Sequence, residues 1–394
     1  MLTLKNELHK ELINNILPYW IQKMPDNENG GFYGRIDGED QVHPSANKGI
    51  ILNARILWTF SAAYRLEKNL DYLKIAERTF EYIRKYFIDK NNGGVFWELN
   101  YKGEPVNKRK QLYAQGFAIY GFSEFFRATG KPEALEAAKN IFYLMEKYAY
   151  DLKHKGYIEA LDVNWKIIDD MRLSARDDNT PKSMNTHLHI LEPYTNLLRV
   201  WKNPALIEAQ TRLINVFCNH IVNSRTKHLR LFFDWEWNYL SNDISYGHDI
   251  EASWLLYEAA EVLGDHELTE KVKNLSIEII EASYEGLQSD GSMIYEKKYD
   301  GHIDTDRHWW VQAETITGSF YAWLLSGDKK HLKIAEKCWK YVKKYLLDKT
   351  NGEWFWSVRA DGTQNRKDDK AGFWKCPYHN SRMCMEIVNS NKKL

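Results

Sequence analysis

The sequence has few of the features that mark a secreted, membrane or metal-bound protein. Its four cysteines follow neither a zinc nor a disulfide spacing, and they stand at Cys218, Cys338, Cys376 and Cys384. No stretch approaches the roughly 18 apolar residues that a membrane helix needs. Residues 1–20 lack the apolar segment and cleavage site of a signal peptide. We therefore expect a reduced, cytoplasmic protein with no membrane partner.

An excess of positive charge is also missing. The 54 basic and 54 acidic residues give a formal net charge of zero. Binding to nucleic acid or to anionic lipid favours a basic excess, so neither is expected as the main partner. The glycine-rich turns carry neither a GxGxxG nor a P-loop pattern, and we expect no nucleotide cofactor.

Aromatic residues, by contrast, are abundant, with 15 tryptophans, 24 tyrosines and 16 phenylalanines. Many must lie in the core. Others sit in polar, glycine-bearing segments such as GGFYG, GGVFWEL, FFDWEWNY and GEWFWSV. Such aromatics either stack against flat, partly apolar ligands such as sugar rings or plug one end of the fold, and the pattern alone leaves both readings open.

Two distant segments reveal an internal repeat. Residues 82–103 read YIRKYFIDKNNGGVFWELNYKG, and residues 341–362 read YVKKYLLDKTNGEWFWSVRADG. Each joins a helix end, an Asp-Lys-x-Asn-Gly turn and an alternating aromatic stretch that ends in a glycine turn, which predicts a short β-hairpin-like loop. Weaker copies occur at 26–38, 153–162, 227–238 and 289–301. The six copies recur at intervals of about 60 to 70 residues and should govern the fold.

Two helical stretches follow each loop, with apolar residues at helical spacing, as in Leu332, Ala335 and Trp339. The first stretch of each pair carries polar residues among apolar ones on several faces, and we expect it to be inner. These inner stretches are 44–66, 107–128, 181–200, 244–263, 306–325 and 374–391. The more charged second stretches are expected to be outer, and they are 70–88, 131–148, 203–223, 265–283 and 328–347, with 4–23 completing the set.

Six helical hairpins can stack into an open solenoid or close into a ring, and a chain of this length could also form two ordinary domains. We predict the closed form, an all-α protein with an (α/α)6 barrel of six helical hairpins. The whole chain, residues 1–394, would then be a single catalytic domain. Alternation of the helices places every inner N-terminus at one end of the barrel, beside the short β-hairpin-like loops, and we expect the active site there.

The inner stretches begin with unusual polar clusters. In SYGHDIEASW, residues 245–254, His248 and Glu251 share one helical face and Ser245 stands at the expected N-cap. Taken singly, such a histidine is ordinarily a satisfied core or capping residue. Six matched clusters instead predict one pocket, and the other members are Asn53, Arg55, Tyr113, Gln115, Asn185, His187, His189, Trp309, Trp310, Gln312, Glu314, Trp374, Tyr378, His379 and Arg382.

Three histidines with an arginine suit the abstraction of a proton beside a carbonyl. Histidine gives and takes protons near neutral pH. We expect Glu251 to orient His248 and raise its basicity, and Arg55, aided by Asn185 and Tyr113, to stabilise a developing oxyanion. Two histidines on opposite faces of a planar enediolate could invert the carbon, and a third could assist the opening of a cyclic sugar.

Three other functions compete with this interpretation. Three histidines could bind zinc, but no HxxxH pattern is present, and His187 and His189 point away from each other on a helix. An (α/α)6 glycoside hydrolase would need two carboxylates across the scissile bond, for which the candidates are Asp177, Asp178, Glu251, Glu296 and Glu314. A sugar-binding protein with a degenerate site is the third alternative.

At these residues the sequence resembles the N-acylglucosamine 2-epimerase superfamily, and most closely its cellobiose 2-epimerases. The resemblance covers essentially the whole chain, through GGFYGRIDG, NARILWTFSAAYR, QLYAQGFAIYG, MNTHLHILEPYTNLLRVW, SYGHDIEASWLL, HWWVQAE and WKCPYHNSRMCMEI. It implies an (α/α)6 barrel and cofactor-independent C2 epimerisation of reducing-end sugars through a ring-opened cis-enediolate.

The resemblance also implies roles for single residues. His248 and His379 would be the acid/base pair, and His189 would aid ring opening or polarise the carbonyl. The remaining matches would bind substrate, with Arg55, Tyr113, Asn185 and Glu251 in the pocket and Trp310 and Trp374 flanking the sugar. His187 matches no catalytic position and is expected to be structural.

N-acylglucosamine epimerases and mannose or sulfoquinovose isomerases share this framework, so they remain alternatives. The stretches WKCPYHNSRMCMEI and MNTHLHILEPY resemble the corresponding sequences of the enzymes that act on disaccharides. We therefore expect a disaccharide such as cellobiose, lactose or a mannobiose-like sugar as the partner, no metal, and a monomer or weak homodimer.

Overall fold

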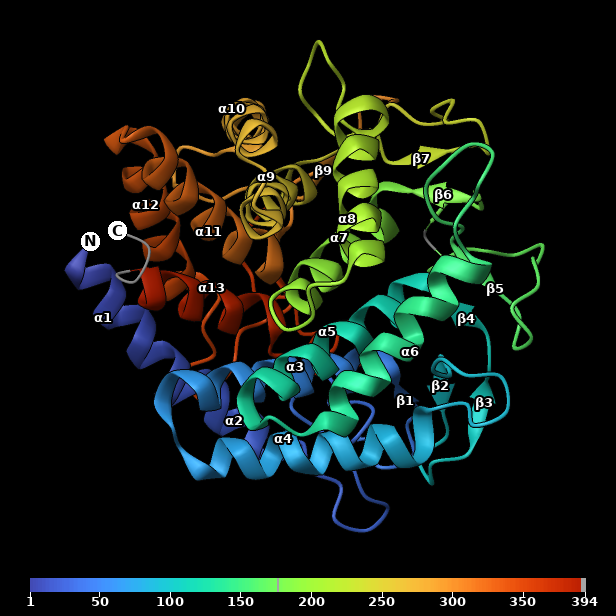
Figure 1. Ribbon diagram of the computed structural model, residues 1–394. Coiled ribbons are helices and arrows are strands. Elements are labelled where there is room, and N and C mark those ends of the chain that lie inside the picture. Colours follow the sequence, from blue (N-terminus) through green and yellow to red (C-terminus); the bar gives the residue numbers. More distant parts are fainter. Residues whose placement is uncertain (176, 391–394) are drawn as a thin grey trace.

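The computed structural model describes residues 1–175 and 177–390, and its inner helices form a closed ring (Figure 1). Each inner helix contacts the next, and the last contacts the first. The predicted (α/α)6 barrel is therefore confirmed and the open solenoid is wrong. The inner helices are α3 (Ile50–Glu67), α5 (Leu112–Thr129), α7 (Met184–Leu198), α9 (Tyr246–Leu263), α11 (Trp309–Ser326) and α13 (Tyr378–Asn389).

The outer helices surround this ring (Figure 1). Each packs the apolar residues of one face against the core. Their apolar residues recur at helical spacing, whereas the inner helices are buried on almost every side. The outer layer consists of α1 (Leu2–Glu11) with α2 (Leu17–Lys23), α4 (Leu70–Tyr82), α6 (Pro132–Tyr148), α8 (Pro204–Val216), α10 (His266–Ser283) and α12 (Lys329–Tyr345).

The helix boundaries differ from the predicted ones in two ways. Every inner helix begins two to six residues later than predicted, because a short strand precedes the first five and a bend precedes α13. Asn391, the last residue of the sixth predicted stretch, lies outside the described residues. Three outer stretches predicted as uninterrupted helices contain π-helical turns, at Leu12–Ile16, Ile83–Phe87 and Phe217–Ile221. The wider turn shifts the side-chain register, and it leaves its last apolar residue buried.

The loops between repeats are joined to one another as well as folded on themselves. The strand that enters an inner helix pairs antiparallel with the loop of the following repeat, and a bridge between Ile36 and Ala371 joins the first loop to the last. A ring of short ladders thus covers one end of the barrel. The pairs are β1 (Lys48–Gly49) with β2 (Glu98–Leu99) and β3 (Pro105–Asn107), β4 (Lys110–Gln111) with β5 (Ala160–Leu161), β6 (Lys182–Ser183) with β7 (Phe232–Phe233), β8 (Ile244–Ser245) with β9 (Glu296–Lys297) and β10 (Ile303–Asp304), and β11 (Arg307–His308) with β12 (Ser357–Val358).

Buried lysine–aspartate pairs fix these loops to the barrel. Lys110, on the strand before α5, donates to Asp89 at 2.8 Å and to the carbonyl of Gly93 at 2.8 Å. Asp89 in turn accepts backbone N–H groups of its own turn, and Gly93 supplies the positive φ, 75°, that closes the turn. The same pairing recurs as Lys48–Asp26, Lys182–Asp151 and Lys370–Asp348.

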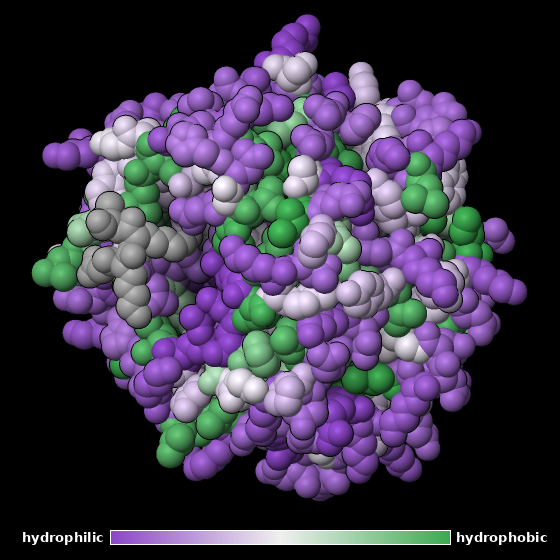
Figure 2. Space-filling view, viewed as in Figure 1, coloured by the Kyte–Doolittle hydropathy of each residue, from purple (hydrophilic) through white to green (hydrophobic). Residues whose placement is uncertain are grey.

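The outside of the barrel is mostly hydrophilic, with scattered apolar side chains, on the face shown in Figure 2. Among the described residues, no helix combines the length and the apolar character needed to cross a membrane.

Candidate active site

One cavity of about 460 Å³ opens at the loop-covered end of the barrel. Each inner helix, or the segment leading into it, contributes at least one side chain, because all six N-termini converge there. The nine residues expected to act on the substrate all line its wall: Arg55, Tyr113, Asn185, His189, His248, Glu251, Trp310, Trp374 and His379. Three other residues predicted for the pocket do not line it, because their side-chain amides hydrogen-bond to backbone groups instead, and they are Asn53, Gln115 and Gln312.

The three histidines of this cavity are held by their Nδ1 atoms. His379 Nδ1 lies 2.7 Å from Glu314 Oε1, and His248 Nδ1 lies 2.7 Å from the Ser245 hydroxyl. His189 Nδ1 lies 3.2 Å from a carboxylate oxygen of Glu192, on the same helix. Nε2 is then the ring nitrogen that each histidine can offer to a ligand.

A single tryptophan ring contacts two of these histidines. The ring centroid of Trp310 lies 4.8 Å from that of His248 and 5.6 Å from that of His379. The His189 ring packs instead against Tyr113 and Phe117, with centroids 4.8 and 5.0 Å away. His248 and His379 therefore border a common space beside the Trp310 ring.

Burial controls the charge of the histidines in this cavity. It lowers the pKa of His248 to about 3. It also lowers the pKa of His379 well below its usual range, with Arg55 and Arg382 adding to the effect, and it lowers the pKa of His189. All three rings are thus neutral at pH 7, which leaves them able to accept a proton.

Arg382 is the centre of the charge network beneath the cavity. Its guanidinium, 1% exposed, donates from Nη2 to Glu251 and to Glu314, each at 2.7 Å, and from Nη1 to Glu192. Two of these carboxylates are the ones that hold His379 and His189. One arginine therefore fixes both histidine partners.

The predicted pairing of Glu251 with His248 is wrong. The two residues share a helical face, but side chains on a helix lean toward its N-terminus. His248 accordingly reaches back to Ser245, while the Oε1 atom of Glu251 accepts a hydrogen bond from Arg382. The Oε2 atom of Glu251 is buried without a hydrogen-bond partner among the described residues.

The three carboxylates around Arg382 differ in charge. Burial would raise the pKa of Glu192, but Arg382, with hydrogen bonds from His189 and Tyr378, lowers it to about 2. Burial and the nearby charge of Glu314 raise the pKa of Glu251, and Arg382 offsets only part of that rise. Because Glu314 has three hydrogen-bond donors around it and Glu251 has one, Glu251 is the member that holds a proton most readily.

A second cationic group, Arg55, lines the cavity. Arg55 donates to the Tyr113 hydroxyl at 2.7 Å and to the carbonyl of Trp374 at 3.3 Å, and its guanidinium lies over the Phe117 ring. Its Nε atom and the Oδ1 atom of Asn185 have no partner among the described residues. Arg55 therefore supplies a donor and a fixed positive charge at the cavity, and Asn185 supplies an acceptor.

Comparison with known proteins agrees with this geometry. The family model for N-acylglucosamine 2-epimerase matches residues 31–382. The chain belongs to the N-acylglucosamine 2-epimerase family. It is therefore a carbohydrate epimerase, an isomerase.

Members of this family with established names match over almost the full length. A cellobiose 2-epimerase from Bacteroides fragilis is 55% identical over 98% of both chains. The solved structure of a cellobiose 2-epimerase from Bacillus thermoamylovorans superposes with a TM-score of 0.94 at 40% identity, covering 100% of both chains. A solved D-mannose isomerase, at 19% identity and a TM-score of 0.86 over 99% of this chain and 98% of its own, shows the shared fold.

The epimerase cavity continues into a second hollow of about 360 Å³. Asn185 and His248 line both, and so do the aromatic rings of Tyr295 and Trp356. Asp177, which sequence reasoning weighed only as a hydrolytic carboxylate, also lies in both walls. Together the two hollows form a groove longer than the site around the histidines.

His187 lies outside this groove, as predicted. Its Nε2 accepts the backbone N–H of Tyr157 at 2.8 Å, and its Nδ1 lies 2.6 Å from the carbonyl oxygen of Ser183. Both ring nitrogens therefore serve the fold.

Glu251, Glu314 and His379 also form the one group of described residues close enough to hold a metal ion. Their ligand atoms lie within 4.8 Å of one another, but Arg382 Nη2 already donates to both carboxylates from between them. The closeness of Glu251 and Glu314 also argues against these two as a glycosidase pair, which needs carboxyl groups about 5 to 9.5 Å apart across the substrate.

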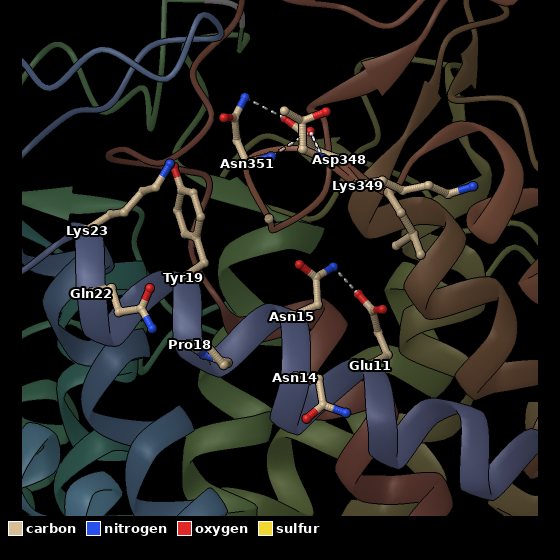
Figure 3. Close-up of a pocket in the computed structure, with 13 residues that line it drawn as sticks. Glu11, Asn14, Asn15, Pro18, Tyr19, Gln22, Lys23, Asp348, Lys349 and Asn351 are labelled. Carbon is tan, nitrogen blue, oxygen red and sulfur yellow. Dashed lines mark hydrogen bonds between the residues drawn. The ribbon is translucent and has the colours of Figure 1, made fainter.

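Another hollow, of about 530 Å³, lies between α1–α2 and the turn around Asp348 (Figure 3). Two of its polar side chains are already bonded within its wall, Asn15 to Glu11 and Asn351 to Asp348. It contains none of the residues of the histidine cavity.

Proposed function

We propose that the chain epimerises C2 of the reducing-end glucose of β-1,4-linked disaccharides, converting cellobiose to glucosyl-mannose and lactose to epilactose without a cofactor. The observation that carries the proposal is the pair His248 and His379, which border one space beside Trp310 with Nε2 free on each ring. The names of the relatives at 37 to 55% identity support the same substrate class.

The first step in this proposal is ring opening. Epimerisation at C2 requires the open-chain aldehyde, because only a carbon beside a carbonyl has an acidic proton. His189, bonded to Glu192, is proposed to move the proton from the O1 hydroxyl toward the ring oxygen. Arg55, with Tyr113 and Asn185, would bind the aldehyde oxygen and stabilise its negative charge as the enediolate forms.

Inversion then needs one proton removed and one returned. One histidine takes the C2 proton on its Nε2. The other enters the step protonated, with a proton taken up from solvent as substrate binds, and delivers that proton to the opposite face of the planar enediolate. One ring gains the proton that the other loses, so the sugar keeps its formula and the pair ends with its roles exchanged. Because burial disfavours the imidazolium in this cavity, the negative charge of the enediolate would offset part of that cost.

The elongated groove supports a disaccharide rather than a monosaccharide. The second hollow adds about 360 Å³ beyond the histidines, and its wall combines Tyr295 and Trp356 with Asp177 and Glu296. Aromatic faces with neighbouring carboxylates suit a second sugar ring, which has an apolar face and a rim of hydroxyls. Trp310 and Trp374 are proposed to flank the reducing-end sugar.

The four cysteines are free, which supports a reducing, cytoplasmic location as part of the same proposal.

Product analysis on three substrates tests the proposal. Cellobiose, N-acetylglucosamine and mannose are incubated separately with the protein, and the products are separated and identified. We expect a mannose-containing disaccharide from cellobiose and little change in the other two. Turnover of N-acetylglucosamine or mannose in preference to cellobiose would reassign the chain within its family, and free glucose from cellobiose would indicate a hydrolase.

A further inference from the structure

Two inner helices begin with the same residue in the same position but use it differently. Ser183 and Ser245 are the N-cap residues of α7 and α9, each at the end of the short strand that enters its helix. The Ser183 hydroxyl accepts the backbone N–H of Thr186 at 3.1 Å, which is the ordinary capping bond. The Ser245 side chain makes no capping bond, and its Oγ lies 2.7 Å from Nδ1 of His248.

This exchange of partners is costly for the helix. A serine at the N-cap stabilises a helix by satisfying one of its free N–H groups, and in α9 that contribution is absent. Ser245 is only 4% exposed, and its backbone pairs with Glu296 of β9, so the residue is firmly placed. A side chain held this well that leaves its helix uncapped to bond a histidine ring points to a role for that ring.

We propose that Ser245 is a positioning residue for His248 in the epimerisation, an inference that rests on the proposed function. A hydroxyl can both donate and accept. It can donate to Nδ1 of the neutral ring, and it can accept Nδ1–H from the protonated ring. His248 can therefore keep the same partner and the same orientation while it gains and loses a proton.

His379, the other member of the proposed pair, has a different kind of partner. The partner of His379 is Glu314, whose ionised carboxylate can only accept. It holds the hydrogen on Nδ1 and leaves the Nε2 lone pair free in the neutral ring. The two members of the proposed pair are thus held by different chemistry, and a change at Ser245 should affect one of them alone.

The test uses Ser245→Ala together with a measurement of half-reactions. Epimerisation of cellobiose should fall about 10- to 100-fold in kcat, the range that loss of a histidine-orienting partner produces in metal sites, while KM stays within about twofold. In D2O, NMR follows deuterium entry at C2 separately in cellobiose and in glucosyl-mannose. The epimer that His379 deprotonates should keep exchanging at nearly the wild-type rate, because Glu314 and His379 are untouched.

Two further substitutions separate positioning from packing. Ser245→Thr keeps the hydroxyl and should restore most of the kcat, whereas Ser245→Cys keeps the volume but bonds weakly and should behave like alanine. Asp265→Ala provides the matched cap control, because Asp265 accepts the N–H of Leu268 at 3.0 Å at the start of outer helix α10. It should lower Tm by about 2 °C without changing kcat. Ser245→Ala removes no capping bond, so a fall in its kcat cannot be ascribed to a weakened helix N-terminus.

The role of Ser245 would be overturned if Ser245→Ala kept the wild-type kcat. It would also be overturned if deuterium entry at C2 slowed equally in cellobiose and in glucosyl-mannose. His248→Asn distinguishes this failure from a failure of the proposed function. If His248→Asn still epimerises cellobiose as the wild type does, the acid/base pair itself is wrong. If His248→Asn is inactive while Ser245→Ala is fully active, only the inference about Ser245 fails.

Discussion

The carboxylate of Glu314 supports the proposed acid/base pair, and Glu314→Gln removes its charge with little change of shape. Glu314 accepts from His379 at 2.7 Å, from Arg382 at 2.7 Å and from Trp254 at 2.9 Å. A hydrogen bond to a charged group contributes about 1 kcal/mol more than a neutral one. Losing the charge beside two of these donors should therefore lower the free energy of unfolding by about 2 kcal/mol.

The same substitution should reduce catalysis. The amide nitrogen of glutamine must face either Trp254 or the His379–Arg382 side, and in both orientations a donor meets a donor. His379 then either meets the amide N–H or keeps only a neutral acceptor. Its tautomer is held less firmly in both cases, and we expect kcat to fall about 10- to 100-fold, equivalent to about 1.4–2.8 kcal/mol in the barrier. Steady-state kinetics on cellobiose and chemical unfolding measure the two effects.

Glu124→Gln is the matched control for this experiment. Glu124 is equally buried at 1% exposure and accepts from Arg65 and Arg127, each at 2.7 Å, but it lies away from the histidine cavity. It should lose about the same 2 kcal/mol of stability and keep its kcat. If Glu314→Gln retains the kcat of Glu124→Gln, the carboxylate does not position His379 and the reasoning is refuted.

Two further predictions concern the loops that surround the cavity. Lys110→Met leaves Asp89 buried without its lysine partner, and it should lower the free energy of unfolding in urea by about 3–5 kcal/mol. Lys74→Met breaks an exposed pair and should lower it by less than about 0.5 kcal/mol. Equal losses in the two variants would contradict the structural role of the buried pairs. Burial would lower the pKa of His228, but Asp249 and Glu285 raise it, so its protonated form stabilises the fold below the unfolded pKa of about 6.5. That contribution should disappear as pH rises through the folded-state pKa of His228, so the Tm of the wild type should fall over this range. The Tm of His228→Gln should lack this fall, and a variant whose Tm depends on pH as the wild type's does would contradict the role of His228.

The architecture could be predicted because each repeat carries the same short-range sequence patterns. Helical spacing of apolar residues and recurring glycine turns identified both layers of helices, and the closed ring followed from six units of one period. The π-helical turns, such as Ile83–Phe87, could not be predicted, because their sequence has the same apolar spacing as the α-helix before them. The buried lysines were also missed, although Lys48 and Lys110 stand 22 and 21 residues after Asp26 and Asp89, a spacing that the repeat would have shown.

The residues that line the cavity could be predicted from the sequence, but their hydrogen-bond partners could not. All nine predicted residues line one space because inner-helix N-termini converge at one end. The partners of the histidines depend on contacts between distant helices, such as Arg382 with Glu192 and Glu314. Glu192 was not selected from the sequence, and Glu251 was assigned to His248 from spacing alone. Helical spacing says which residues share a face, and it does not say which neighbour each side chain meets.

Incubation of the metal-free protein with cellobiose in D2O, followed by NMR, tests the central claim most directly. The account predicts a mannose-containing disaccharide with deuterium at C2, since the proton removed by one histidine is replaced by one from solvent-equilibrated groups. It also predicts that His248→Asn and His379→Asn each stop the epimerisation. Unchanged cellobiose without deuterium at C2, or full epimerisation by either variant, would contradict it.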